Sequence, residues 1–413
     1  MLPAWARNRA VVSWCLYDLA NSVYAAVIPA TVWSAYYAGV IVGNAGEGAR
    51  WWGRAVSATM IFVAVTSPFT GAMADLAGWR KRLLTVYTLI SITATALLAT
   101  VAPGMVVYGF LVSVVAGIGF EGAMVFYNSF LPELVSADKR GRLSGMGFAV
   151  GYAGSFAGLV AALPLVRAER YGQAFAVVAL LFLVFALPAL LWLPHDRVKS
   201  RGLWRAGVHG WRGTLQTARD IGRSTVLRRF LIAFLLYDDG VNTVIAFSSI
   251  FARETLGFAM TDLILVYMCV QLSALLGAAL WARPTDTKGP KFVVLTTIVQ
   301  WVVIVGLVYL VRSRTQFFIV AALAGTGLGA IQAASRAFMA TLIPRGREGE
   351  FFGFYSLCGK SSAVVGPLLF GEIAAATGGN LRLAALSVLV LFVAGGLVLA
   401  SVRAGGPTTA REG

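Results

Sequence analysis

Long apolar runs separated by short polar segments fill most of the sequence. The runs at 83–102, 174–193, 292–311 and 383–402 each reach the roughly 20 residues that cross a bilayer as an α-helix. The pattern predicts an all-α membrane protein with 12 transmembrane helices. The predicted spans are 11–38, 53–75, 83–102, 105–133, 143–166, 172–193, 229–252, 262–283, 291–312, 316–343, 352–377 and 382–402.

The composition supports lipid as the main solvent. Hydrophobic residues make up 58% of the chain, charged residues 13%, and the mean hydropathy is +0.78. Soluble domains usually carry about 25% charged residues, so this chain cannot cover a water-exposed surface. The net charge of +16 would suggest a nucleic-acid partner in a soluble protein. Here the basic residues lie mostly between the apolar runs, and no nucleic-acid binding is expected.

The distribution of Lys and Arg predicts the orientation. With the N-terminus inside, the inside segments hold basic clusters at 80–82, 139–142 and 197–229, and the outside segments hold few basic residues. This asymmetry predicts a multi-pass protein of the cytoplasmic (inner) membrane with both termini in the cytoplasm. The first apolar segment is too long for a signal peptide and should remain as a span. The basic residues on the outside are Arg50, Arg54, Arg167, Arg170, Arg253, Arg312, Arg314 and Arg382.

One long polar stretch, 194–228, divides the chain. It is strongly basic, and Trp204 and Trp211 lie seven residues apart, on one face of a helix. We therefore expect an N-terminal six-helix bundle at 1–193, a basic cytoplasmic linker at 194–228 and a C-terminal six-helix bundle at 229–413. An amphipathic helix on an anionic inner leaflet fits the linker's pattern. A plain connection between the halves and a regulatory or partner-binding segment are the alternatives.

The two halves repeat each other in sequence. Asp18-x-x-Asn21-Ser22 matches Asp239-x-x-Asn242-Thr243 at a nearly constant offset. The same order recurs elsewhere, so the repeat is parallel and predicts two pseudo-symmetric bundles with a site between them near the membrane midplane. The further matches are Asp75-x-x-Gly78-x-Arg80 with Asp286-x-x-Gly289-x-Lys291, Pro132 with Pro344, and Gly141, Gly147 and Gly154 with Gly353, Gly359 and Gly366.

Several motifs resemble those of known transporters. Gly71-x-x-x-Asp75-x-x-Gly78-x-Arg80-Lys81 resembles the signature loop of the major facilitator superfamily, with a degenerate copy at 286–291. The segments 14–22, 237–241 and 350–357 resemble the branch that contains the fungal vacuolar amino-acid effluxers and many bacterial permeases. The resemblance implies the major facilitator fold and transport by alternating access.

Ionisable residues inside spans are costly and therefore mark candidate sites. The functional interpretation is that the carboxylates bind a cationic group or a coupling proton, while the basic side chains hold an anionic group. The alternative is that these charges pair with one another and only stabilise or gate the bundle. The candidate substrate- or proton-binding residues are Asp18, Asn21, Glu121, Asn128, Asp239, Asn242, Arg336 and Lys360.

A second set of charges belongs to the predicted cytoplasmic end. In the superfamily that this chain resembles, the acidic residue of the signature loop pairs across the halves and locks the outward-facing state, which implies this role for Asp75. Plain topological signals are the alternative for Arg80 and Lys81. Gly147-xxx-Gly151 and Gly154-xxx-Gly158 predict close helix packing in the fifth span. The candidate gating residues are Asp75, Arg80, Lys81, Glu133, Arg142 and Asp286.

The predicted function is secondary active transport of a small polar or zwitterionic solute such as an amino acid, coupled to protons and directed to export. Efflux of amphipathic drugs or lipids is one alternative, and a membrane scaffold or sensor without transport is another. No enzyme is expected, because no nucleophile–base or metal constellation occurs. The three cysteines and two histidines lack metal-ligand spacing, so no metal and no cofactor is expected beyond a proton gradient. The expected partners are the solute and membrane lipid, and the expected state is a monomer.

Overall fold

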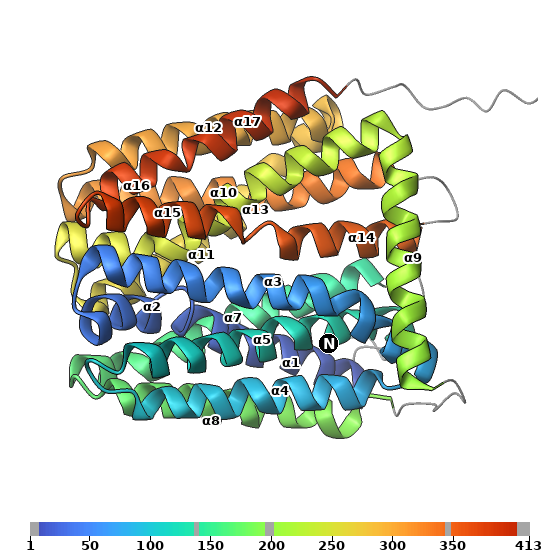
Figure 1. Ribbon diagram of the computed structural model, residues 1–413, viewed down its shortest axis with the longest axis horizontal. Helices are drawn as coiled ribbons and strands as arrows, with labels where there is room; N and C mark the ends of the chain where they lie inside the picture. The colour runs from blue at the N-terminus through green and yellow to red at the C-terminus, as the bar shows by residue number, and fades with distance from the viewer. Residues whose placement is uncertain (1–7, 136–139, 195–201, 343–347, 403–413) are drawn as a thin grey trace, which may run out of the picture.

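The computed structural model describes residues 8–135, 140–194, 202–342 and 348–402, and every regular element in these ranges is helical. Two groups of long helices lie side by side, one from each half of the chain (Figure 1). The N-terminal group comprises α1 (Arg9–Val27), α2 (Val32–Tyr36), the π-helical turn η2 (Tyr37–Val42), α3 (Ala45–Ala77), α4 (Arg80–Leu97), η3 (Leu98–Thr100), α5 (Val106–Ser129), α6 (Leu131–Leu134), α7 (Arg140–Arg167) and α8 (Tyr171–Trp192). After α9 (Leu203–Arg223), the C-terminal group comprises α10 (Thr225–Leu256), α11 (Met260–Lys288), α12 (Pro290–Leu310), α13 (Arg314–Leu342), α14 (Glu348–Ser361), α15 (Val365–Ala376), α16 (Leu381–Ser387) and α17 (Leu389–Ala400).

The structure contains the 12 predicted spans if the eleventh span, which is a broken helix, is counted as one. Eleven helical stretches of the described residues are long and apolar enough to cross a membrane. The remaining predicted span, 352–377, consists of α14 and α15 with a break between them. Pro367 favours the break, because it has no amide hydrogen to donate to the carbonyl group four residues earlier. The predicted fold of 12 spans in two bundles is therefore confirmed, with its eleventh helix discontinuous.

The second span begins earlier than predicted. The sequence predicts a start at 53, whereas α3 begins at Ala45. Asn44 caps this helix, because its side-chain oxygen accepts a hydrogen bond from the amide of Glu47 at 3.0 Å. A polar first turn with a good cap forms helix without an apolar run, which is why hydropathy missed it. As a result Arg50 and Arg54 lie within α3, one turn apart.

Glycines bring α7 against α1, as the two small-residue motifs predict. A Cβ atom at Gly154 would overlap the carbonyl oxygen of Leu19, and one at Gly158 would stand 3.0 Å from the Val23 side chain. An approach this close requires glycine, because any side chain would displace the backbone of α1.

One lysine contact repeats in both halves at the ends of the spans. Lys81 donates to the carbonyl oxygens of Leu191 at 3.0 Å and Leu193 at 2.8 Å, at the end of α8. Lys291 donates to the carbonyl oxygens of Ala400 and Val402, at the end of α17. Both lysines cap the C-terminus of the last helix in their half, where a cation is favourable. By contacts, Lys291 therefore corresponds to Lys81 rather than to its sequence match Arg80.

Candidate functional site

An ion pair joins the two halves in the interior of the molecule. Lys360, in the last turn of α14, lies 2.7 Å from Glu121 Oε2 on α5 and donates to the Glu121 carbonyl oxygen at 3.1 Å. The side chains are only 18% and 21% exposed, so water screens the pair weakly. The functional interpretation of the sequence predicts that these residues bind separate ligand groups, and its alternative predicts that they pair. In the structure Glu121 and Lys360 form an ion pair, as the alternative predicts.

Asp18 has a different environment. Its carboxylate faces α7, where a Cβ atom at Gly147 would stand 3.0 Å from Asp18 Oδ2 and one at Gly151 would stand 3.5 Å from Cγ. The residue is half-buried. Within the described part of the chain, its carboxylate makes no hydrogen bond or ion pair. The charge of this half-buried carboxylate is therefore not compensated by any donor among the described residues.

Asp239 occupies the matching position on α10 and lies at the break in the eleventh span. Its Oδ2 accepts a hydrogen bond of 2.8 Å from the amide of Gly366, in the first turn of α15. The residue is 4% exposed, and Oδ1 has no hydrogen-bond partner among the described residues. Beside it, Asp238 accepts from Ser362 at 2.5 Å and from Asn242 at 3.2 Å. The two carboxylates thus hold both sides of the break.

The remaining candidates do not gather in one cluster. Asn21 is 3% exposed and its amide contacts Met124 Sδ at 2.9 Å, while its Oδ1 has no partner in the described ranges. Asn128 and Arg336 are exposed. The structure therefore places Glu121 with Lys360 and Asn242 with Asp238 and Ser362, and leaves Asn128 and Arg336 on accessible surface.

Arg80 and Glu133, two of the predicted gating residues, contact each other within the N-terminal half. Arg80 pairs with Glu133 at 2.6 Å and donates to the carbonyl oxygen of Ser129 at 3.3 Å. These contacts fix the start of α4 against the end of α5. The side chains of Asp75, Arg142 and Asp286 lie outside the described part of the chain, so their predicted roles stay predictions.

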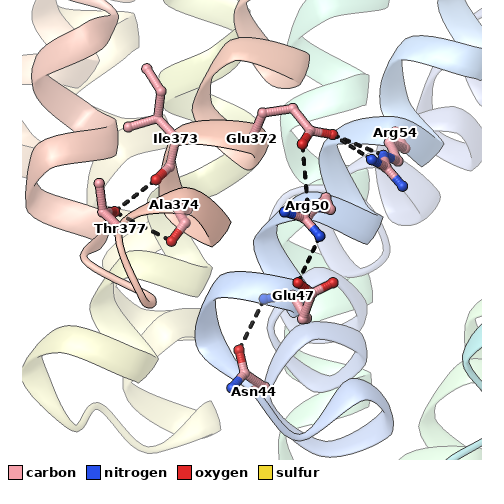
Figure 2. A network of polar contacts seen from close by, with 8 residues as sticks. All are labelled: Asn44, Glu47, Arg50, Arg54, Glu372, Ile373, Ala374 and Thr377. Carbon is pink, nitrogen blue, oxygen red and sulfur yellow. Dashed lines mark hydrogen bonds and ion pairs between the residues drawn. The ribbon is translucent and has the colours of Figure 1, made fainter.

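A second network joins the halves at the opposite end (Figure 2). Glu372 on α15 points toward α3, where it lies 2.6 Å from Arg54 Nη2 and 3.2 Å from Arg50 Nε. Arg50 also pairs with Glu47 at 2.8 Å. The Glu372 and Arg54 side chains are 47% and 46% exposed. Because exposed pairs contribute only about 0–1 kcal/mol each, this network alone cannot hold the halves together.

Close backbone packing accompanies these ion pairs. A Cβ atom at Gly53 on α3 would overlap the carbonyl oxygen of Pro367 on α15. Nearby, Ser57 donates to the Val364 carbonyl oxygen at 2.8 Å, and the Trp52 indole donates to that of Ala246 at 3.0 Å. The halves are therefore sealed by buried contacts at the end where Arg50, Arg54 and Glu372 lie, which the charge pattern predicts to face outward.

The charge pattern assigns no role to Glu372, and it treats Arg50 and Arg54 only as topological signals. The residues of the Arg54–Glu372 pair are separated by 318 positions in the chain. One signal in the sequence could have found this pair. An acidic residue is predicted late in the eleventh span and two basic residues at the start of the second span, so they are predicted to lie at a similar depth in the membrane. Only the packing of the two bundles shows that they meet.

A mostly apolar cavity of about 130 Å³ lies largely within the C-terminal half, and Ala30 and Thr31 of the N-terminal half complete its lining. Phe247 and Phe251 line it, together with Ser248, Tyr267 and Gln271. None of the predicted site residues whose side chains the structure describes borders it. Ligand pockets for drug-sized molecules usually measure about 300–1,000 Å³, so this cavity holds at most a small apolar group.

Comparison with known proteins settles the family. A sequence profile described as "Vacuole effluxer Atg22 like" matches residues 52–405, most of the chain. The chain belongs to the Atg22 family. Its relatives include an uncharacterised MFS-type transporter, YxiO, of Bacillus subtilis, which is 29% identical over 94% of both chains. Autophagy-related protein 22 of Yarrowia lipolytica is 24% identical over 81% of this chain and 72% of its own.

Solved structures give the same fold. The crystal structure of the nucleoside transporter NupG superposes with a TM-score of 0.73, covering 97% of this chain and 100% of that one at 14% identity. At this identity the likeness concerns the fold alone. Together with the Atg22-family relatives, it shows that this protein is a multi-pass membrane transporter of the major facilitator type. The protein is therefore a transporter, and the alternative of a membrane scaffold or sensor without transport is rejected.

Proposed function

We propose that the protein is a proton-coupled secondary transporter that moves a small zwitterionic solute, such as an amino acid, by alternating access. The observation that carries the proposal is the Glu121–Lys360 pair, which joins the halves and is about four-fifths buried. A zwitterion offers an ammonium group to Glu121 and a carboxylate to Lys360. It can therefore replace the pair without leaving either charge unsatisfied, whereas a neutral solute would strand both.

The pair's position supports a link between binding and movement. Lys360 stands immediately before the break between α14 and α15, and Ser57 of the other half contacts Val364 within that break. Splitting the pair would release α14 from α5 while α15 stays bound to α3. We therefore assign the closed end to the extracytoplasmic gate.

Asp18 is our candidate for the coupling proton. It faces the interface of α1 and α7 and has no donor among the described residues to hold its charge. Uptake and release of a proton there would change the packing of these two helices. The names of the Atg22-family relatives support export as the direction, and the proposal extends that direction to this chain.

Efflux of an amphipathic solute would need aromatic side chains that line an open cavity, yet many of the aromatic side chains are packed in the core. Trp33, Tyr37, Phe126 and Tyr127 are each at most 2% exposed. The cavity beside Phe247 is too small for a drug-sized solute. These observations support a polar solute over an amphipathic one.

The test is counterflow in proteoliposomes with a panel of labelled amino acids. The wild type should exchange at least one of them, and Glu121→Gln and Lys360→Gln should each lose that exchange. Asp262→Asn is the matched control, because Asp262 pairs with Arg314 at 3.1 Å within one half. Full exchange by both interface variants would refute the role of the pair, and exchange of none of the panel would refute the solute class.

A further inference from the structure

The helix α9 lies across one end of the bundle, roughly perpendicular to the spans (Figure 1). It contacts α3 from the N-terminal half and α14 from the C-terminal half. The contacts with α3 are at Pro68, Phe69 and Ala72, near the end of that helix. This end carries the basic clusters that predict the cytoplasmic side, so α9 runs in the plane where the membrane surface is expected.

Three stripes run along α9, and the first is the face that packs on the protein. Gly207, Thr217 and Ile221 on this stripe are buried. A Cβ atom at Gly207 would overlap the Phe69 ring, and one at Gly210 would overlap the Ala72 side chain. Because these glycines have no side chain, α9 is held directly against α3 and its rotation about its own axis is fixed.

The second stripe is apolar and is turned about 100° from the packed face, the angle between successive residues of a helix. It consists of Trp204, Val208, Trp211 and Leu215, at spacings of four and three. Trp204 is 73% exposed and Leu215 is 51% exposed. Aromatic and aliphatic side chains on an exposed helix face at this depth suit the boundary between headgroups and acyl chains.

This apolar stripe continues the exposed apolar surface of a span. The Trp204 ring packs edge-on against Phe69 at 5.3 Å between ring centroids. Phe69 follows Phe62 and Val65 on one face of α3, and these two side chains are 46% and 54% exposed. The exposed apolar surface of α3 therefore runs on to α9.

The third stripe is basic and lies on the far side of the apolar one. It consists of Arg205, His209, Arg212, Gln216, Arg219 and Arg223, and all six are exposed. The one acidic residue of α9, Asp220, lies off this stripe and faces Arg223 at 3.9 Å. Guanidinium groups spaced along one edge, next to an apolar stripe, complement a row of lipid phosphates.

We propose that α9 is a surface-bound helix that inserts its apolar stripe into the cytoplasmic leaflet and binds anionic phospholipid headgroups with its basic stripe. The occupant is the bilayer itself, because the apolar stripe is continuous with a membrane-spanning surface and the fixed rotation of α9 presents both stripes together. This inference stands apart from the transported solute and from the coupling proton.

The experiment places an environment-sensitive fluorophore at Leu215→Cys, with the three native cysteines replaced, in the full chain reconstituted into nanodiscs. Discs of zwitterionic lipid are compared with discs that contain anionic lipid, using brominated lipids and an aqueous quencher. We expect several-fold stronger quenching by brominated lipid in anionic discs, and a clear loss of that difference at high salt. The variant Arg205→Glu/Arg212→Glu/Arg219→Glu should lose the difference as well.

A matched charge change at the opposite end is the control. Arg167→Glu/Arg170→Glu/Arg312→Glu alters the net charge equally at exposed sites and should keep the lipid preference. Thermal unfolding in detergent confirms that both variants are folded. If the aqueous quencher reached the label equally well in both kinds of disc, the proposal would be overturned. That result would point to a soluble protein partner for this face of α9. Equal loss in both triple variants would also overturn it, since the effect would then follow net charge alone.

Discussion

Asp18 and Asp239 occupy matching positions in the two halves, yet their carboxylates are held differently. Each lies on the first helix of its half and faces a glycine of the fifth helix, Gly151 for Asp18 and Gly366 for Asp239. In the N-terminal half the partner helix α7 is continuous. In the C-terminal half it is broken, and Asp239 accepts the amide hydrogen that the break leaves free.

The two carboxylates therefore differ in what they bond: that of Asp239 accepts a structural hydrogen bond, whereas that of Asp18 accepts none from the described residues. Asp239 acts as the cap of α15, so its charge compensates an unpaired donor and a helix N-terminus. Asp18 has no such donor in the described residues, which is why we propose Asp18 rather than Asp239 as the proton site. A repeated sequence motif therefore predicts the position of a side chain but not its chemistry, which depends on the helix opposite.

The largest expected effect comes from filling the space beside Asp239, whereas the same change beside Asp18 should cost much less. Gly366→Ala would drive a Cβ atom into Thr243 Oγ1, a hydroxyl already bonded to the Asp239 carbonyl oxygen at 2.7 Å. We expect a loss of about 3 kcal/mol, the upper range for overpacking. Gly151→Ala meets Ser22 Oγ at 2.9 Å and Asp18 at an ordinary contact distance of 3.5 Å, and it should change stability by less than about 1 kcal/mol because serine can rotate. Thermal unfolding of both variants in one detergent makes the measurement, and equal losses would contradict the difference between the halves.

The next effect concerns the carboxylates themselves. Asp239→Ala removes the acceptor of the Gly366 amide and should cost about 1–2 kcal/mol, whereas Asp239→Asn keeps an oxygen there and should cost only a few tenths. Asp18→Ala should stay within about 0.5 kcal/mol, since no hydrogen bond within the described ranges is lost. Denaturant or thermal titration of the three variants measures this order. A larger loss for Asp18→Ala than for Asp239→Ala would reverse the assignment of roles.

The structural difference between the halves was only partly visible in the sequence. The motif Asp-x-x-Asn-Ser/Thr places both carboxylates at matching positions, and in the structure both face the fifth helix of their half. Asp18, however, faces Gly151 and not Gly154, the sequence match of Gly366. Gly366-Pro367 alone does not predict the break, because Pro68, Pro164, Pro188 and Pro284 all lie inside continuous helices. Whether a proline breaks a helix depends on what satisfies the freed backbone groups, and here Asp239 does so from another helix.

Contacts between the halves were the least predictable. Hydropathy and charge placed Glu121, Lys360, Arg50 and Glu372 at approximate depths, but depth does not say which helices touch. The pairing of Lys360 with Glu121 and of Glu372 with the two arginines follows from how the bundles pack, which is a long-range property. Local pattern gives faces and ends of helices, whereas partners across a bundle interface require the assembled fold.

The coupling role that we propose for Asp18 predicts a change in the response to pH. Asp18→Asn cannot exchange a proton, so solute flux driven by an imposed pH gradient should fall roughly tenfold, while counterflow without a gradient should persist. Asp239→Asn should retain most of the gradient-driven flux, because its role is a cap that an amide can fill. Flux in proteoliposomes with and without the gradient tests both. Full gradient-driven flux in Asp18→Asn would remove Asp18 as the proton site.

The smallest effect is expected where the halves meet at the predicted outer end. Glu372→Gln removes pairs whose side chains are 29–47% exposed, and solvent screening limits its cost to less than about 0.5 kcal/mol. Gly53→Leu instead drives a side chain into the Pro367 carbonyl oxygen, which a Cβ atom alone would already overlap. It should open this end far more than Glu372→Gln does. Distances between spin labels at Glu169 and Arg312, exposed sites on opposite halves, measure the opening. If Glu372→Gln opened the end as widely as Gly53→Leu, the ion pairs rather than the backbone packing would be the seal.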